Sequence, residues 1–129
     1  MPSKNSNFLP LLISGILGFL GVALGAFGAH GLKSIVTPDL LLIYETGSRY
    51  HLIHSVVLFV IALSDKWGES KSLRVGFWGI FIGILIFSGS LYILTITGLR
   101  ILGAVTPIGG VSFLVGWLAI AYSAFSFRK

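Results

Sequence analysis

The chain has 129 residues and a formal net charge of +5, with 55% hydrophobic and 10% charged residues. A soluble domain carries about 25% charged residues, so this composition excludes a chain that covers itself with a water-facing surface. The mean hydropathy of +0.97 agrees. There is no cysteine, which excludes disulfides, thiolate nucleophiles and cysteine-based metal sites. The basic residues lie at segment ends and in loops, so the net charge does not indicate a nucleic-acid partner.

Four apolar segments are predicted to cross the membrane as helices. The first, residues 8–29, has 22 residues without a charge, and at about 1.5 Å per residue it spans about 33 Å, enough for a bilayer core. A cleaved signal peptide is the alternative, which this length disfavours because the apolar region of such peptides has about 7–15 residues. The other predicted spans are residues 43–63, 73–96 and 106–127. We therefore predict a single membrane domain, residues 1–129, folded as an all-α bundle of four transmembrane helices.

Two threonine–proline pairs indicate where helices begin. At the first pair, Thr37 is a capping residue, Pro38 suits the first helical position and Asp39 places an acid in the first turn. Thr106 and Pro107 repeat the pattern before the last apolar segment. The second helix is therefore predicted to begin at Pro38, which makes it longer than the membrane requires.

The distribution of basic residues predicts the orientation in the membrane. Four spans place both termini on one side, together with the connection between the second and third helices. That side holds Lys4, Lys66, Lys71, Arg74, Arg128 and Lys129. The other side holds Lys33 and Arg100, with Arg49 near it. Because basic residues are enriched in cytoplasmic loops, both termini are predicted to be cytoplasmic and the protein to lie in the plasma (inner) membrane.

Small residues recur at intervals of three and four along three of the four helices. Such residues let membrane helices approach closely. They are Ser14, Gly18, Gly21, Gly25 and Gly28 in the first helix; Gly76, Gly79, Gly83 and Ser90 in the third; and Gly109, Ser112, Gly116, Ala119 and Ser123 in the fourth. Packing within one chain is the simpler interpretation, and a homo-oligomer is the alternative.

The second helix differs because it carries large polar side chains. Its purely apolar part is too short to span a membrane, so part of residues 44–51 must lie at membrane depth. Counting back at about 1.5 Å per residue from Ser64 places His54 near the bilayer midplane. A neutral imidazole at that depth needs a donor and an acceptor. We expect Trp117 or a serine of the third helix to pair with it.

The polar groups at membrane depth gather in the predicted outer half of the bundle. Two interpretations stay open for them: a structural clamp between helices, or a functional site. His30 also has an interpretation as the C-terminal cap of the first helix. The candidate polar site comprises His54, Tyr50, His30, Ser88, Ser90 and Trp117.

Other polar and aromatic residues have simpler interpretations. Glu45 and Arg49 are i, i+4 neighbours, which predicts an ion pair at the membrane interface. Tyr44 and Tyr92 are expected to lie in an outer aromatic belt.

No catalytic constellation is visible, so we expect no enzyme activity. The sequence shows no phosphate-binding loop, nucleophile–base pair or carboxylate dyad. His51 and His54 have a spacing that a metal could use, but no further buried acid or cysteine accompanies them. We therefore expect no metal and no cofactor.

Four ordered segments carry a resemblance to a known family. They are residues 25–32 (GAFGAHGL), residues 50–54 (YHLIH), residues 87–92 (FSGSLY) and residues 106–117, which begin TPIGG and end GW. Together they resemble the DUF423 (UPF0382) family of small four-helix membrane proteins from bacteria. The resemblance implies a bacterial membrane protein and indicates no particular activity.

The resemblance also sorts the candidate residues. The family pattern usually has glutamine at the position of His51, which argues against a metal site there, and it varies at Arg49. The candidates that match the pattern are His30, Tyr50, His54, Ser88, Ser90, Thr106, Pro107 and Trp117.

Three functions fit these observations. The first is a non-enzymatic accessory or interaction protein, whose partner is the lipid bilayer, another membrane protein or a second copy of the chain. The second is a permeation protein for a small solute or proton. The third is a protein that binds a lipid or a quinone beside His54.

Overall fold

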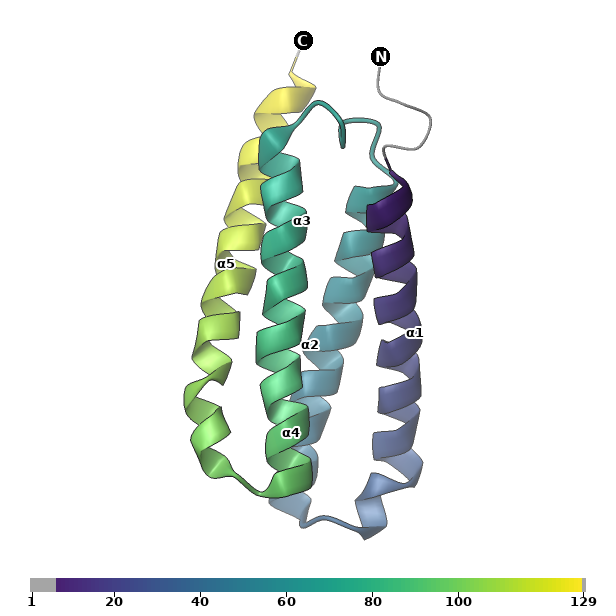
Figure 1. Ribbon diagram of the computed structural model, residues 1–129, viewed down its shortest axis with the longest axis vertical. Helices are drawn as coiled ribbons and strands as arrows, with labels where there is room; N and C mark the ends of the chain where they lie inside the picture. Colours follow the sequence, from purple (N-terminus) through teal and green to yellow (C-terminus); the bar gives the residue numbers. More distant parts are fainter. Residues whose placement is uncertain (1–6, 129) are drawn as a thin grey trace.

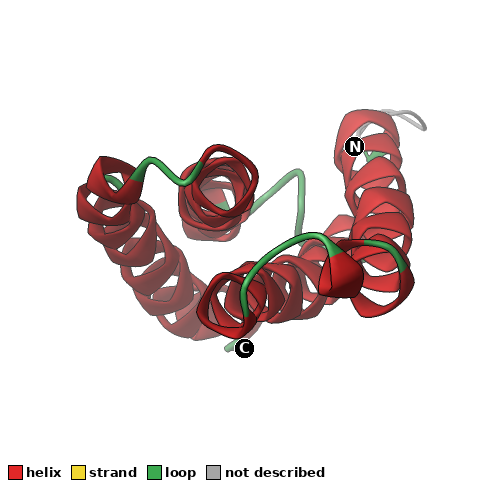
Figure 2. Cartoon of the chain, turned by 90° about the horizontal axis from the view of Figure 1, so that it is seen from below, coloured by secondary structure: helices red, strands yellow, loops and turns green. Residues whose placement is uncertain are grey.

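The computed structural model describes residues 7–128 and shows four long helical rods that alternate in direction (Figure 1). The end-on view in Figure 2 shows helices side by side and no strand in the described part of the chain. The rods begin and end within two residues of the predicted helices. They are α1 (Phe8–His30); α2 (Pro38–Ala62); α3 (Lys71–Gly83), which continues through a π-helical turn (Ile84–Ser88) into α4 (Gly89–Thr97); and α5 (Thr106–Ser123), which ends in a 3₁₀ turn (Ala124–Phe127).

Three of the rods are long and apolar enough to cross a membrane. These segments are Phe8–Ser34, Lys71–Thr97 and Arg100–Phe127. Helix α2 is not one of them, and it carries Glu45, Arg49 and two histidines within its 25 residues. The fold is thus all-helical in the described part of the chain, with three candidate membrane-spanning segments.

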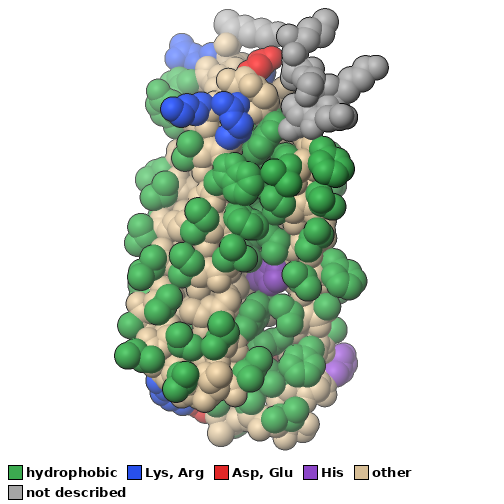
Figure 3. All heavy atoms as spheres, viewed as in Figure 1, with side chains coloured by type: hydrophobic (Ala, Val, Ile, Leu, Met, Phe, Trp, Pro, Cys, Tyr) green, Lys and Arg blue, Asp and Glu red, His purple; other side chains and the backbone are tan. Residues whose placement is uncertain are grey.

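The surface of the bundle is apolar, as a lipid-facing surface requires. Large hydrophobic side chains such as Phe19 (72% exposed), Ile101 (78%) and Leu118 (72%) point outward. Figure 3 shows hydrophobic side chains over the middle of the face in view and charged side chains only at its two ends. In water such a surface would drive aggregation, whereas lipid tails solvate it.

The helices pack in pairs through their small residues. Helix α1 lies on α2, α3 lies on α5, and α2 contacts α4 and the π-helical turn. A Cβ atom added to Gly28 would lie 2.4 Å from the Tyr44 ring, and one added to Gly79 would lie 3.0 Å from the Cα of Gly116. These positions of the predicted small-residue seams therefore serve contacts within the chain, whereas an added Cβ at Gly18 would meet nothing within 4 Å.

The helix ends follow the sequence signals only in part. Ser70 caps α3, since its hydroxyl accepts a hydrogen bond from the Leu73 N–H at 3.2 Å. Thr37 occupies the N-cap position of α2 with extended backbone, as predicted, but its hydroxyl donates to the Asp39 carboxylate and accepts no hydrogen bond from the helix. Helix α4 ends at Gly98, whose φ of 72° lies in the left-handed region that favours glycine.

An ion pair closes the end of the bundle opposite the chain termini. Arg100, in the connection before α5, lies 2.6 Å from the Asp39 carboxylate in the first turn of α2. The Thr37 hydroxyl, followed by the Arg100 guanidinium, lowers the pKa of Asp39 to about 2. Both partners are exposed, so the pair connects two chain segments with little net stabilisation.

Replacing either of the side chains that donate to Asp39 is expected to raise the pKa of Asp39 toward its ordinary value of 3.8. Thr37→Val should raise it more than Arg100→Gln, because the Thr37 hydrogen bond is the larger cause of the shift. Because its pKa is lowered, the ionised Asp39 carboxylate stabilises the folded chain above about pH 4, and this stabilisation is lost as the pH falls toward 2. Carboxyl NMR titration measures the pKa directly. Lys66→Gln, at the other end of the bundle, is the control and should leave the Asp39 titration unchanged.

Candidate functional site

The polar side chains of α2 divide into two clusters that face different helices. His54 faces α5, where it meets Trp117. His51 faces α1 and α4, where it meets Leu17 and Tyr92. Both histidines are buried, with exposed fractions of 5% and 3%. One turn of α2 therefore contacts α1 and α4 through His51 and α5 through His54.

The hydrogen bonds of His54 define its tautomer. Its Nδ1 lies 2.7 Å from the Tyr50 carbonyl oxygen, which can only accept, so Nδ1 carries the proton. Its Nε2 accepts from the Trp117 indole N–H at 3.1 Å. The expected pairing of His54 with Trp117 is confirmed, and the ring is neutral with both nitrogens engaged.

Aromatic rings enclose His54. The Phe113 ring stacks on the imidazole with centroids 3.9 Å apart and planes 19° apart. The Tyr50 ring lies nearly parallel to the imidazole at 5.8 Å. Phe87 contacts both Tyr50, at 4.7 Å, and Phe113, at 5.5 Å. These rings form one aromatic cluster that joins α2, α5 and the π-helical turn. Its members are Tyr50, His54, Phe87, Phe113 and Trp117.

A groove opens beside this cluster between α2 and α5. Its volume is about 690 Å³, and its lining is mostly apolar. We call it the α2–α5 groove. The aromatic side chains and His54 form part of its wall, and the Arg49 side chain lines it as the sole charged group among its described lining residues. The other lining residues are Ile53, Pro107, Gly110, Val111 and Leu114.

His51 forms the second cluster, with the opposite tautomer. Its Nε2 lies 2.9 Å from the Leu17 carbonyl oxygen, so Nε2 carries the proton, and its Nδ1 accepts from the Tyr92 hydroxyl at 2.8 Å. Gly21 lies beside the ring: an added Cβ would make an ordinary contact with the imidazole at 3.6 Å and a tight one with the Leu52 side chain at 3.1 Å. His51 thus joins α1, α2 and α4.

The two tyrosines expected in an outer aromatic belt lie inside the bundle. Tyr44 is 1% exposed, and its hydroxyl donates to the Leu24 carbonyl oxygen at 2.5 Å. Tyr92 donates to His51 and packs against Tyr44 with centroids 5.0 Å apart. The belt prediction is wrong because it considers depth in the membrane and not which way the helix faces.

Replacing His51 with glutamine is expected to cost less than about 1 kcal/mol. The amide N–H can donate to the Leu17 carbonyl and the amide oxygen can accept from Tyr92, so both bonds survive. His51→Leu has similar bulk but leaves the Tyr92 hydroxyl without its acceptor, at a cost of about 1–3 kcal/mol. Reversible unfolding in mixed micelles compares the two variants. Equal losses would contradict this role of His51.

The predicted serines connect helices at the π-helical turn. The Ser88 hydroxyl donates to the Gly47 carbonyl oxygen of α2 at 2.7 Å. The Ser90 hydroxyl donates to the Phe87 carbonyl oxygen at 2.9 Å and lies 2.6 Å from the Thr106 hydroxyl oxygen at the start of α5. Both serines fasten the turn that carries Phe87, and neither contacts His54 through a hydrogen bond.

Other predicted site residues lie apart from His54. His30 is exposed at the end of α1, and among the described residues no hydrogen bond joins it to the other candidates. Glu45 and Arg49 are both exposed, and no ion pair joins them; the two pairs in the described chain are Arg100–Asp39 and Lys66–Glu69. An exposed i, i+4 pair gains only about 0.3–0.5 kcal/mol, too little to hold two flexible side chains together.

The structure adds Phe87 and Phe113 to the site. Phe113 precedes Trp117 by one helical turn, so the spacing could have indicated that both face His54. The position of Phe87 was not accessible from spacing, because the π-helical turn changes the direction in which the following side chains point.

Hydrogen bonds and the composition of the groove lining decide which groups the site presents. Both nitrogens of His54 are engaged, so neither is free to bind a metal or accept a proton. The described residues contain no group of three or more His, Cys, Asp or Glu side chains that could hold a metal ion. What the site offers is a set of ring faces, an apolar wall and one guanidinium.

Comparisons with known proteins agree with this picture of a membrane protein. The family model described as "Protein of unknown function (DUF423)" matches residues 24–110. A Bacillus subtilis UPF0382 membrane protein, YwdK, is 45% identical over 115 residues, which cover 88% of this chain and 94% of the relative. A UPF0382 membrane protein of Haemophilus influenzae is 41% identical over 119 residues, covering 92% and 95%.

No solved structure gives a significant match.

A third relative, a UPF0382 membrane protein of Staphylococcus aureus, is 37% identical over 119 residues that cover 91% of this chain and 95% of the relative. These matches extend over almost the whole length of both chains. The chain therefore belongs to the DUF423 family, whose curated relatives are the bacterial UPF0382 membrane proteins.

Proposed function

We propose that this protein is a non-enzymatic binding protein of the bacterial plasma membrane, and that its α2–α5 groove takes up a membrane-dissolved amphiphile with a flat, carbonyl-bearing ring and an apolar tail, such as a quinone. The observation that carries the proposal is the groove itself. An open hollow of about 690 Å³ lies directly against the aromatic cluster of His54 and Trp117. Pockets of this size, apolar with a few polar groups, are typical of small-molecule sites.

The proposal includes a fourth membrane span, α2. Average hydropathy underestimates this helix because His51, His54 and Ser55 are buried against other helices and do not face lipid. A helix of 25 residues is about 37 Å long, which exceeds a bilayer core of about 30 Å. From Tyr50 onward its exposed residues suit a lipid-facing side: Tyr50, Leu52, Ile53, Val56, Phe59 and Val60, followed by Leu63 just after the helix ends.

The proposed orientation places the end of the bundle that carries both termini in the cytoplasm. Lys66, Lys71, Arg74 and Arg128 lie at that end, whereas Lys33 and Arg100 lie at the other. The predicted contributions of Lys4 and Lys129 fall outside the described residues. An excess of basic residues on the cytoplasmic side supports this orientation. Labelling of single cysteines by an impermeant thiol reagent in intact cells tests it: a cysteine at position 33 should react and one at position 66 should not.

The chemistry of the groove favours a flat ring. Tyr50, Phe87 and Phe113 present ring faces and edges that stack with another planar group, each contact contributing about 0.5–1.5 kcal/mol. Arg49 offers N–H donors to a carbonyl oxygen. An apolar tail can extend into lipid, because the groove opens at the surface of the bundle.

Fluorescence of Trp117 provides a direct test. In a protein that keeps Trp117 and carries Trp67→Phe and Trp78→Phe, a decyl-substituted benzoquinone should quench the emission saturably in lipid vesicles, because Trp117 lines the groove. Gly110→Leu should abolish the saturable part, since a Cβ added to Gly110 points into open space beside Phe87, 4.0 Å away. Gly18→Leu, on α1 and with nothing within 4 Å, is the matched control.

Quenching that rises linearly with quinone concentration and is equal in the Gly110→Leu protein would show simple partition into the membrane and refute the proposal. In that case co-purification from detergent-solubilised membranes would decide between the remaining functions. A stoichiometric membrane-protein partner would support the accessory role in a larger assembly. Solute flux into vesicles that is lost in His54→Ala would support permeation.

A further inference from the structure

A second groove follows the contact between α3 and α5. Two hollows of about 610 and 600 Å³ share Lys71, Val75 and Val115, so they form one continuous groove. On α3 its lining residues recur at helical spacing, from Lys71 through Val75 and Trp78 to Ile82. We call it the α3–α5 groove, and its floor is the glycine contact at which the two helices touch.

The groove has the length of one membrane leaflet. From Ser70 to Ile82 the chain advances 12 residues, which is about 18 Å along a helix. Half of a bilayer core is about 15 Å thick. One end therefore lies at the headgroup level and the other near the membrane centre, which matches the dimensions of a phospholipid with its acyl chain in the groove.

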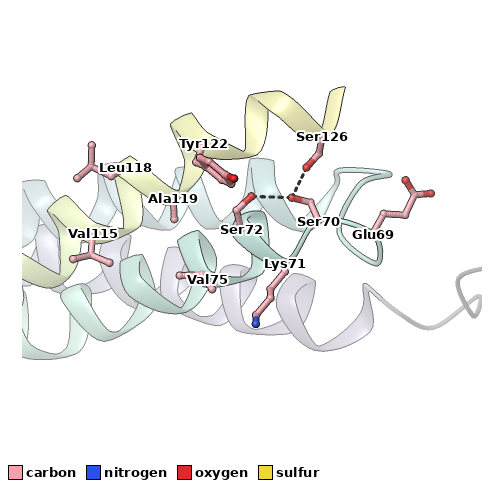
Figure 4. Close-up of a pocket in the computed structure, with 10 residues that line it drawn as sticks. All are labelled: Glu69, Ser70, Lys71, Ser72, Val75, Val115, Leu118, Ala119, Tyr122 and Ser126. Atoms are coloured by element: carbon pink, nitrogen blue, oxygen red, sulfur yellow. Dashed lines mark hydrogen bonds between the residues drawn. The ribbon is translucent and has the colours of Figure 1, made fainter. Parts of the chain in front are cut away.

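The groove is polar at one end only. Figure 4 shows Ser70, Ser72 and Ser126 joined by hydrogen bonds at the end of the bundle, with Tyr122 beside them and Val75, Val115 and Leu118 farther along. The hydroxyl oxygen of Ser70 lies 3.2 Å from that of Ser72 and 3.0 Å from that of Ser126. The apolar residues continue toward the membrane centre, so the lining changes from polar to apolar along its length.

Uncompensated positive charge lies at the polar end. Lys71 and Arg74 line the groove and belong to neither of the ion pairs in the described chain. One N–H of Arg74 donates to the Trp67 carbonyl oxygen at 2.8 Å, which holds the guanidinium in place and leaves further donors. Glu69 is the one acid among the described lining residues, and Lys66 neutralises it at 3.3 Å.

We propose that the α3–α5 groove binds an anionic phospholipid, with its phosphate between Lys71 and Arg74 and one acyl chain along Val75, Trp78 and Ile82. Lys71 points away from the serine cluster in Figure 4. Lys71 and Arg74 both line the part of the groove that also holds Trp78 and Ile82. The two cations are i, i+3 neighbours and so lie on one face of α3. A zwitterionic lipid would bring its own positive group to this end, so the site discriminates by charge.

Trp78 reports on this groove because it lines it. The experiment uses a protein that keeps Trp78 and carries Trp67→Phe and Trp117→Phe, in vesicles of phosphatidylcholine and phosphatidylglycerol in which one lipid at a time is brominated. Brominated phosphatidylglycerol should quench Trp78 with an apparent affinity about fivefold or more above that of brominated phosphatidylcholine. Lys71→Gln should reduce this preference about fivefold, and about 1 M salt should do the same.

Arg128→Gln is the matched control, because it removes one positive charge from the same end of the bundle without lining the groove. It should leave the preference unchanged. Equal quenching by the two lipids, or equal losses in Lys71→Gln and Arg128→Gln, would overturn the proposal in favour of a diffuse attraction. Native mass spectrometry of the unsubstituted protein, released from the same mixed vesicles, is independent of the tryptophan changes. It should show retained phosphatidylglycerol in excess over phosphatidylcholine, and equal retention would also overturn the proposal.

Discussion

Gly109→Ala is expected to destabilise the bundle by about 3 kcal/mol, the upper end of the usual range for overpacking. A Cβ atom at Gly109 would lie 2.3 Å from the backbone nitrogen and 2.8 Å from the Cα of Phe87. Backbone atoms cannot move aside as a flexible side chain can, so α5 and the π-helical turn would have to separate. That separation would also displace Phe87 from the aromatic cluster and widen the α2–α5 groove.

Reversible unfolding in mixed micelles measures this loss, and Gly89→Ala is the matched control. Gly89 follows the same π-helical turn, but an added Cβ meets nothing within 4 Å. Alanine there should be neutral or stabilise by about 0.5–1 kcal/mol, because it lowers the entropy of the unfolded chain. A Gly109→Ala protein as stable as Gly89→Ala would show that the two backbones are not in contact.

His54→Ala is expected to cost about 2–4 kcal/mol. It leaves a cavity beside the Phe113 ring and removes the acceptor of the Trp117 indole N–H, two losses that add. His54→Phe keeps a ring against Phe113 and removes only the hydrogen bonds, so it should lose less. The comparison separates the packing of the imidazole from its polar role.

A double-mutant cycle isolates the hydrogen bond between the two side chains. His54→Phe, Trp117→Phe and the double variant should give a coupling between about 0.6 kcal/mol, the average for hydrogen bonds between membrane helices, and about 1.7 kcal/mol, the largest of them. The contact distance of 3.1 Å supports a value in this range. Zero coupling would show that the indole and the imidazole do not pair in the membrane.

The two histidines show how far the candidate site was predictable. Distance from a helix end predicted the depth of His54, and depth in turn predicted that its ring needs partners, of which Trp117 is one. The family resemblance set His51 aside as a position where glutamine is usual, whereas the structure buries it at 3% exposure between α1 and α4. Depth follows from counting along one helix, but the direction of a side chain depends on how that helix is rotated against its neighbours.

The sequence by itself determined the membrane class, the bounds of the four helices, the basic end of the bundle and the positions of the small-residue seams. Each of these depends on composition or on spacing along a single helix, which the order of residues contains directly. The family relationship was also readable from four short segments, and the comparisons confirm it.

Only the tertiary structure decided which helix each seam meets, which tautomer each histidine adopts and where the two grooves lie. The π-helical turn at Ile84–Ser88 illustrates the reason. It rotates the second half of its rod, brings Ser88 to Gly47 and sets Phe87 against Gly109. Such contacts arise when several helices settle together into one close-packed arrangement, and no single segment specifies them.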